Sequence, residues 1–228
     1  MKFFLRLSAL IVVAIAIGCD HDIPTVCCTV GDPHVRVVNA FTTPVDVLID
    51  GAIAIQSLAP STIGTASPTL GAHTLVLRPT SGGSVSQSIT TTSGVLNTIA
   101  AVRTSNGVVN VAMLDDTGSI VPAGATKVRV LHLAPNAGEI QVYRTQPDFQ
   151  QLSRWQFPFT YQSEPTSLSA PFFQSTVGTW EIHAWQTPAD ASGWASAPVK
   201  VVIQLGSGEK KTVIILDNPG GGIRAELI

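Results

Sequence analysis

Histidine and cysteine are the residue types in this chain best suited to chemistry, and its 228 residues include five of the former and three of the latter. His73 and His183 fall within runs of alternating apolar and polar residues, which is typical of strands. His132 ends a similar run, where a hydrogen bond at a strand end explains it better than catalysis. The sequence has no GxSxG turn, Walker loop or HExxH pair. We therefore expect no catalytic residue, no cofactor and no enzymatic activity.

Two of the cysteines, Cys27 and Cys28, are adjacent. Consecutive Cα atoms lie ~3.8 Å apart, less than the roughly 4.4–6.8 Å that disulfides usually span, so we expect a cross-link to another chain or free thiols. The surrounding segment adds five potential metal ligands, Asp20, His21, Asp22, Asp32 and His34. Because no CxxC or HxxxH spacing occurs and a tether does not preorganise ligands, we expect a solvated spacer and no metal site. A metal or redox role for this segment is the alternative.

The third cysteine, Cys19, ends an export signal. Lys2 and Arg6 precede an unbroken apolar run, Ala9–Ile17, which is too short to span a bilayer. Small residues before the cysteine resemble a bacterial lipobox, with Ala16 in the place of the usual leucine. We expect residues 1–18 to be removed, Cys19 to carry the lipid, and residues 19–33 to form a tether. The alternative is an ordinary signal peptide that leaves the cysteine unmodified.

Short alternating runs of Val, Ile, Leu and Thr, bounded by Gly, Pro and Ser, predict strands throughout the rest of the chain. Runs beginning at Val35, Ile140 and Gly178 are examples, and the run at Val35 recurs 93 residues later at Val128. This period matches a small sandwich domain with about seven short strands. The sequence therefore predicts two tandem immunoglobulin-like antiparallel β-sandwich domains, residues 34–116 and 127–228, joined by a linker over 117–126.

The alternation also fixes which side chains should face each core, and a slip of one residue would expose all of them. The predicted inward positions are Val35, Val37, Val45, Val47, Leu75 and Leu77 in the first copy, and Val128, Val130, Ile140, Val142, Ile182 and Ala184 in the second.

Strand and turn residues carry a family resemblance. Val35–Asn39, Pro44–Val47, Asp50-Gly51 and Gly71–Leu75 resemble the domain of unknown function 4397, DUF4397. The second copy resembles it through the segment Ala134-Pro135-Asn136-Ala137 and departs from it over Arg144–Pro171, which is longer than the equivalent segment of the first copy. The resemblance implies an exported bacterial envelope domain, often found in tandem, without an established activity.

Aromatic residues are concentrated in the second copy. After Cys19, eleven of twelve lie beyond residue 140, including all four tryptophans. We expect Trp180 to pack in the core, whereas Trp185 has the opposite strand parity and should point outward. The hypothesis is that four side chains form a platform for a glycan or another envelope protein: Trp155, Tyr161, Trp185 and Trp194. The alternative is that the inserted segment folds back and buries them.

The charge balance excludes one class of partner. A net charge of −2, with 12% charged residues, provides no basic excess to neutralise phosphates, so we expect no nucleic-acid partner. We expect a non-enzymatic protein, exported and lipid-anchored to a membrane on the periplasmic side or at the surface of a bacterial cell envelope, with a structural, adhesive or spacing role. The alternative is a carbohydrate- or protein-binding module that uses the aromatics of the second copy.

Overall fold

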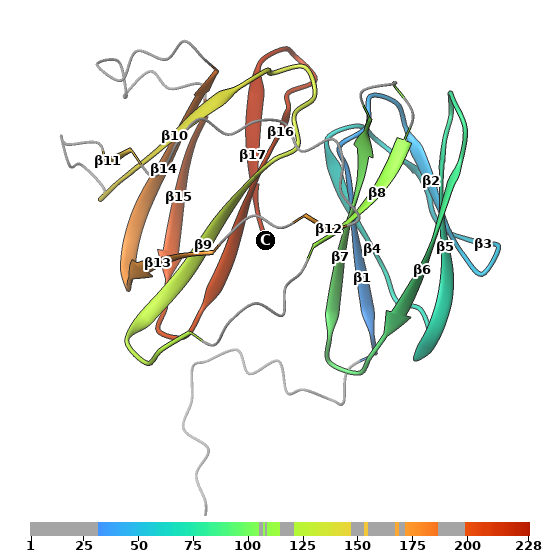
Figure 1. Ribbon diagram of the computed structural model, residues 1–228, viewed down its shortest axis with the longest axis horizontal. Coiled ribbons are helices and arrows are strands. Elements are labelled where there is room, and N and C mark those ends of the chain that lie inside the picture. Colours follow the sequence, from blue (N-terminus) through green and yellow to red (C-terminus); the bar gives the residue numbers. More distant parts are fainter. Residues whose placement is uncertain are drawn as a thin grey trace, which may run out of the picture.

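The computed structural model describes residues 32–104, 107, 109–114, 121–146, 153–154, 167–168, 172–186 and 199–228. Within them every regular element is a β-strand, and the strands form two sandwiches that lie side by side (Figure 1). The fold is all-β, as the residue alternation predicts. The same residues contain no helix with the length and apolar character that crossing a membrane would require.

The first sandwich packs a five-stranded sheet, in the order β12-β8-β7-β1-β4, against a four-stranded sheet, in the order β3-β2-β5-β6. Its strands are β1 (His34–Asn39), β2 (Val45–Ile49), β3 (Ala52–Leu58), β4 (Thr62–Ala66), β5 (Gly71–Pro79), β6 (Val85–Thr91), β7 (Leu96–Arg103), β8 (Val109–Leu114) and β12 (Ser167–Leu168).

The second sandwich packs two four-stranded sheets, in the orders β13-β9-β16-β17 and β11-β10-β14-β15. Its strands are β9 (Ala125–His132), β10 (Ile140–Thr145), β11 (Ser153–Arg154), β13 (Phe173–Thr176), β14 (Gly178–Gln186), β15 (Val199–Leu205), β16 (Lys210–Asp217) and β17 (Ile223–Leu227).

Both sandwiches follow one pairing scheme. The antiparallel neighbours β2, β5 and β6 correspond to β10, β14 and β15. Each sandwich contains an equivalent parallel pair, β1 with β7 and β9 with β16, and β12 also pairs in parallel with β8. The expectation of antiparallel sheets throughout is therefore wrong. The two equivalent pairs form because the chain passes through the opposite sheet between their strands, and parallel partners need such a long connection in place of a hairpin.

The predicted core register is confirmed in both sandwiches. Every one of the inward positions named above is at most 1% exposed and belongs to one of the two sandwich cores. Cross-strand neighbours such as Val47 and Leu77 lie opposite each other in adjacent strands, so their side chains emerge on the same face of the sheet.

Asn39 and His132 end equivalent strands, β1 and β9, and both bind backbone groups there, as predicted. The Asn39 side-chain amide donates to the carbonyl oxygen of Leu58 at 2.8 Å and accepts from the amide of Phe41 at 2.9 Å. In His132, Nδ1 accepts from the amide two residues later at 3.3 Å, and Nε2 bonds the carbonyl oxygen of Gly138. A carbonyl oxygen only accepts, so Nε2 carries the proton. Burial lowers the pKa of His132, which favours this neutral form.

Candidate functional site

Most residues singled out for binding or lipidation lie outside the described part of the chain. These are Cys19, Trp155, Tyr161 and Trp194, and the paired cysteines Cys27 and Cys28 lie outside it too. The structure therefore tests the aromatic platform at one position, Trp185.

Trp185 lies on β14 with its side chain on the face opposite Ile182 and Ala184, as the strand parity predicts, but the expectation that it is exposed is wrong. It is 8% exposed. Its ring meets that of Tyr143, on the neighbouring strand β10, edge to face at 5.1 Å between centroids, and stacks with His183 at 6.0 Å. Neighbouring aromatic rings on the outer face of the sheet thus pack against it. Trp180 packs against the core, as expected.

A charged cluster occupies the same outer face of this sheet. Glu181 is 5% exposed and His183 is fully buried. One carboxylate oxygen of Glu181 lies 3.1 Å from Nε2 of His183, and the other lies 3.1 Å from Nζ of Lys200. Burial raises the pKa of Glu181, but the hydrogen bonds from Lys200 and His183 outweigh it, so the pKa lies below its usual value. The glutamate is thus held ionised by its partners, which suits a structural ion pair.

Sequence reasoning did not find this cluster, although a signal was present. Glu181 and His183 are two residues apart on one strand, so they share a face, and Lys200 lies opposite His183 in β15. Polar residues two positions apart within a long apolar strand indicate that their side chains pair with each other on its outer face.

His73 forms a second histidine–carboxylate pair, in the first sandwich. Asp50 and Gly51 form the two-residue turn between β2 and β3, with φ of 52° and 82°, and this backbone suits a tight hairpin. The turn places Oδ2 of Asp50 2.6 Å from Nδ1 of His73, while Nε2 of His73 lies 2.8 Å from the carbonyl oxygen of Thr69. The pair also lines a hollow of about 500 Å³ between β3 and β4.

Both nitrogens of His73 face acceptors, so only the doubly protonated imidazolium satisfies both bonds. The hydrogen bond to Asp50, followed by that to Thr69, raises the pKa of His73, and the same pairing lowers the pKa of Asp50. With no nitrogen lone pair left to accept a proton, His73 is a structural cation in this arrangement and not a general base.

The pair predicts a pH-dependent stability. The pKa of His73 is higher in the folded than in the unfolded chain, where it is about 6.5. Its contribution is therefore complete below about pH 6.5 and disappears as pH rises through the folded-state pKa. We expect the difference in melting temperature between the wild type and His73→Gln to be larger at about pH 5.5 than at about pH 9. Thermal unfolding followed by circular dichroism measures it. A difference that does not change with pH would contradict the assignment, and subtracting the variant removes the contributions of the other histidines.

Apolar side chains join the two sandwiches. The outer face of the sheet containing β1 and β7 packs against that of the sheet containing β9 and β16. The residues of this interface are Val38, Ala40, Ala100, Val102 and Leu114 from the first sandwich, and Leu131, Leu133, Ile214 and Leu216 from the second. All are at most 7% exposed. We call this set the inter-sandwich layer.

Two further contacts link the sandwiches. Strand β12, from the segment inserted in the second copy, pairs in parallel with β8 of the first sandwich through Ser167 and Leu168. The guanidinium of Arg224, on β17, donates to the carbonyl oxygen of Ser61. The insertion therefore contributes a strand to each sandwich, β11 to the second and β12 to the first. The sequence did not predict that the insertion would pair with both sandwiches.

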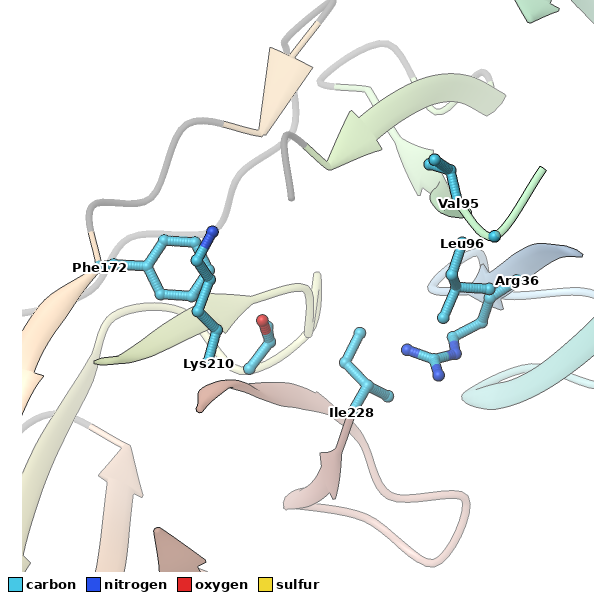
Figure 2. Close-up of a pocket in the computed structure, with 8 residues that line it drawn as sticks. Arg36, Val95, Leu96, Phe172, Lys210 and Ile228 are labelled. Atoms are coloured by element: carbon cyan, nitrogen blue, oxygen red, sulfur yellow. The ribbon is translucent and has the colours of Figure 1, made fainter. Parts of the chain in front are cut away.

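A cleft of about 470 Å³ opens beside the inter-sandwich layer. Figure 2 shows Arg36, Val95 and Leu96 on one wall, Phe172 and Lys210 on the other, and Ile228 between them. Arg36 lies on the same outer face of β1 as Val38, and Lys210 on the same face of β16 as Ile214. The cleft therefore exists only where the two sandwiches meet.

Among the residues that the structure describes, no three His, Cys, Asp or Glu side chains gather in a way that would hold a metal ion. The three histidines considered as catalytic candidates lie at separate places in the structure. His73, His132 and His183 belong to three different hydrogen-bonded clusters.

No curated protein matches the chain. Among solved structures it is similar to a product complex of SpuA, a multi-modular glycogen-degrading pneumococcal virulence factor, at 9% identity and a TM-score of 0.28, covering 85% of this chain and 21% of that one. The chain thus spans about a fifth of that structure. A second match is to family 41 carbohydrate-binding modules from streptococcal virulence factors, at 10% identity and a TM-score of 0.28, covering 85% and 96%. TM-scores this low do not establish a shared fold.

The family comparison agrees with the resemblance seen in the strand and turn residues. The family model spans β1–β8 of the first sandwich and extends through β9 into β10 of the second. Through residues 33–143, the chain belongs to the family described as Domain of unknown function (DUF4397).

Proposed function

We propose that this chain is an exported, lipid-anchored protein of the bacterial cell envelope whose two sandwiches form one stiff, non-enzymatic unit that spaces or presents a surface. The inter-sandwich layer is the observation that carries the proposal. Domains joined only by a linker move relative to each other unless their interface is large and apolar. Here the central strands are buried on both faces, as in β7, where Ile99 faces the sandwich core and Ala100 faces the partner sandwich.

The energetics favour a fixed arrangement. Burying a side chain such as Leu131 or Ile214, both fully buried, is worth roughly 1.5–3 kcal/mol relative to exposing it. The layer contains nine buried positions. Although two of them are small alanines, the burial free energy summed over all nine far exceeds thermal energy. A layer of this kind holds the two sandwiches at one angle, which is the property that a spacer needs.

The lack of enzymatic activity is part of the proposal, and the state of the histidines supports it. His73 has both nitrogens engaged with acceptors, and burial favours neutral His132 with Nε2 bound to a carbonyl oxygen. Neither offers an unoccupied basic nitrogen to a substrate in this arrangement.

The membrane partner follows from the proposed lipid at Cys19. A diacylglyceryl group and an amide-linked acyl chain bury many methylenes at ~0.8 kcal/mol each, which suffices for stable anchoring. Residues 19–33 would then connect the membrane to β1. A glycan or protein partner for Trp155, Tyr161 and Trp194 stays a prediction, whereas the burial of Trp185 argues against a role for that residue in an open platform.

Mass spectrometry of the intact protein from membranes of its native host tests this proposal. We expect the mass of residues 19–228 plus one diacylglyceryl group and one or more acyl chains, and we expect Cys19→Ala to leave the membrane fraction. Recovery of an unmodified chain, or a Cys19→Ala variant that stays in the membrane, would contradict the proposed anchor.

A further inference from the structure

We propose that a second pocket, at the opposite end of the inter-sandwich layer from the cleft, binds a neutral saccharide ring. The inference goes beyond the proposed function, since a spacer needs no ligand. It rests on the stiff arrangement proposed there, because both sandwiches line the pocket. The pocket shares no residue with the aromatic platform considered above.

This pocket has a volume of about 310 Å³ and opens where the inter-sandwich layer ends. Ala40 and Leu216 belong to that layer, and the residues that follow them, Phe41 and Asp217, line the pocket. The first sandwich contributes Phe41, Thr42 and Ser61, and the second contributes Asn136, Asp217 and Asn218. Small-molecule sites have volumes from ~300 Å³ upward, so this pocket suits one small ring.

A carboxylate is fixed in the pocket by its neighbour. Oδ2 of Asp217 accepts from Nδ2 of Asn136 at 2.9 Å, and the backbone amide of Asn136 lies 3.3 Å from Oδ1 and 3.4 Å from Oδ2. Burial raises the pKa of Asp217 despite these hydrogen bonds, so the carboxylate is incompletely solvated. A ligand hydroxyl that donates to Asp217 would compensate for the lost water.

Four further polar groups around the pocket have no hydrogen-bond partner within the part of the chain that the structure describes. They are the hydroxyls of Thr42 and Ser61, Oδ1 of Asn136 and Nδ2 of Asn218. The hydroxyls both donate and accept, the amide oxygen accepts and the amide nitrogen donates. The hydroxyls of a sugar ring match this mixture, because each of them donates one hydrogen bond and accepts others.

The rest of the lining selects against other ligands. Phe41, Pro60 and Pro219 add apolar surface, against which the C–H groups of a sugar ring pack. Of the described residues that line the pocket, Asp217 alone carries a charge, which disfavours an anion. A wholly apolar ligand would leave the polar groups without partners, at a cost in binding free energy.

The backbone of Ser61 is a second, independent observation. Its φ of 57° lies in the left-handed region, which glycine adopts at lower cost, and its carbonyl oxygen accepts from the guanidinium of Arg224 in the other sandwich. A serine at this position places a hydroxyl at the pocket at the expense of backbone strain. Strain of this kind is concentrated at ligand-binding and active sites.

The test uses residues 19–228 with Cys19→Ser, which include every residue that the structure describes. Glucose, galactose, mannose and N-acetylglucosamine are titrated separately and followed by backbone amide chemical shifts. We expect saturable binding of at least one sugar with a Kd of about 1–10 mM, as suits a ligand of a dozen or so heavy atoms. The shifted amides should lie around Asp217 and Ser61. Trialanine, a peptide probe of similar size, should not bind.

Single substitutions locate the site. Asp217→Asn keeps the shape of the side chain but removes its charge, and should weaken binding about tenfold. Glu209→Gln is the matched control: it removes one negative charge at the other end of β16, where Glu209 pairs with Lys211, and should leave affinity unchanged. Ser61→Gly should weaken binding several-fold while the melting temperature stays the same or rises, because glycine suits the backbone there. A merely structural serine would affect stability and not affinity.

The proposal is overturned if none of the four sugars binds, if trialanine binds equally well, or if Asp217→Asn and Glu209→Gln have the same effect. Thermal unfolding shows whether each variant remains folded. Failure of the pocket is distinguishable from failure of the stiff unit. If the two sandwiches share one alignment tensor in residual dipolar couplings and no sugar binds, the pocket alone is refuted.

Discussion

Replacing Ile214 by Asp should uncouple the unfolding of the two sandwiches while each stays folded. Ile214 is fully buried in the inter-sandwich layer, whereas its neighbours Val213 and Ile215 face the core of the second sandwich. A carboxylate left unpaired at this position costs roughly 3–5 kcal/mol, and this loss falls on the layer that couples the two sandwiches and not on either sandwich core. Calorimetry should then show two unfolding transitions where the wild type shows one.

Two matched control variants show whether the effect is specific to the inter-sandwich layer. Val213→Asp places the same charge in the sandwich core one residue away, and we expect it to unfold the second sandwich. Val177→Asp places it between β13 and β14, where the side chain is 47% exposed, and should change stability by no more than about 0.5 kcal/mol. If Ile214→Asp behaves like Val177→Asp, the layer does not hold the sandwiches together.

Replacing Trp185 by Ala should lower the free energy of unfolding by about 3–5 kcal/mol. The side chain is 8% exposed and packs against Tyr143 and His183, so its removal leaves a cavity and breaks the aromatic pair. Chemical denaturation at fixed pH measures the change. Trp185→Phe keeps an apolar ring at this position and should lose clearly less stability.

An exposed platform would give the opposite result. If Trp185 contacted a glycan from an open surface, Trp185→Ala would change stability by about 0.5 kcal/mol or less and would reduce binding to a cell-wall glycan. That pair of observations would reinstate the platform.

Alternation of apolar and polar residues predicted the strands and their inward faces, because one face of every strand must be buried whatever the tertiary arrangement. It predicted Val35 and Val37 correctly for that reason. It did not predict that some strands are buried on their second face as well. Strands buried on both faces lose their alternation of apolar and polar residues. The unbroken apolar runs Ile99–Val102 and Val213–Leu216 therefore carried a signal of this second buried face.

The candidate site was harder to predict because burial of an outward residue depends on what packs over it. Parity placed Trp185 on the correct face, yet only the structure shows that its side chain is buried there and packs against Tyr143 and His183. The cleft could not be predicted from the sequence for the same reason, because it depends on tertiary packing. Arg36 and Lys210 are 174 positions apart, and only the packing of two sandwiches brings them to opposite walls of one cleft.

Residual dipolar couplings of the two sandwiches in the wild-type protein test most directly whether they form one stiff unit. If the inter-sandwich layer fixes their arrangement, the couplings from both sandwiches will fit a single alignment tensor with the orientations of this structure. If the sandwiches move independently, each will need its own tensor of different magnitude, and the proposal of a stiff spacer will be wrong.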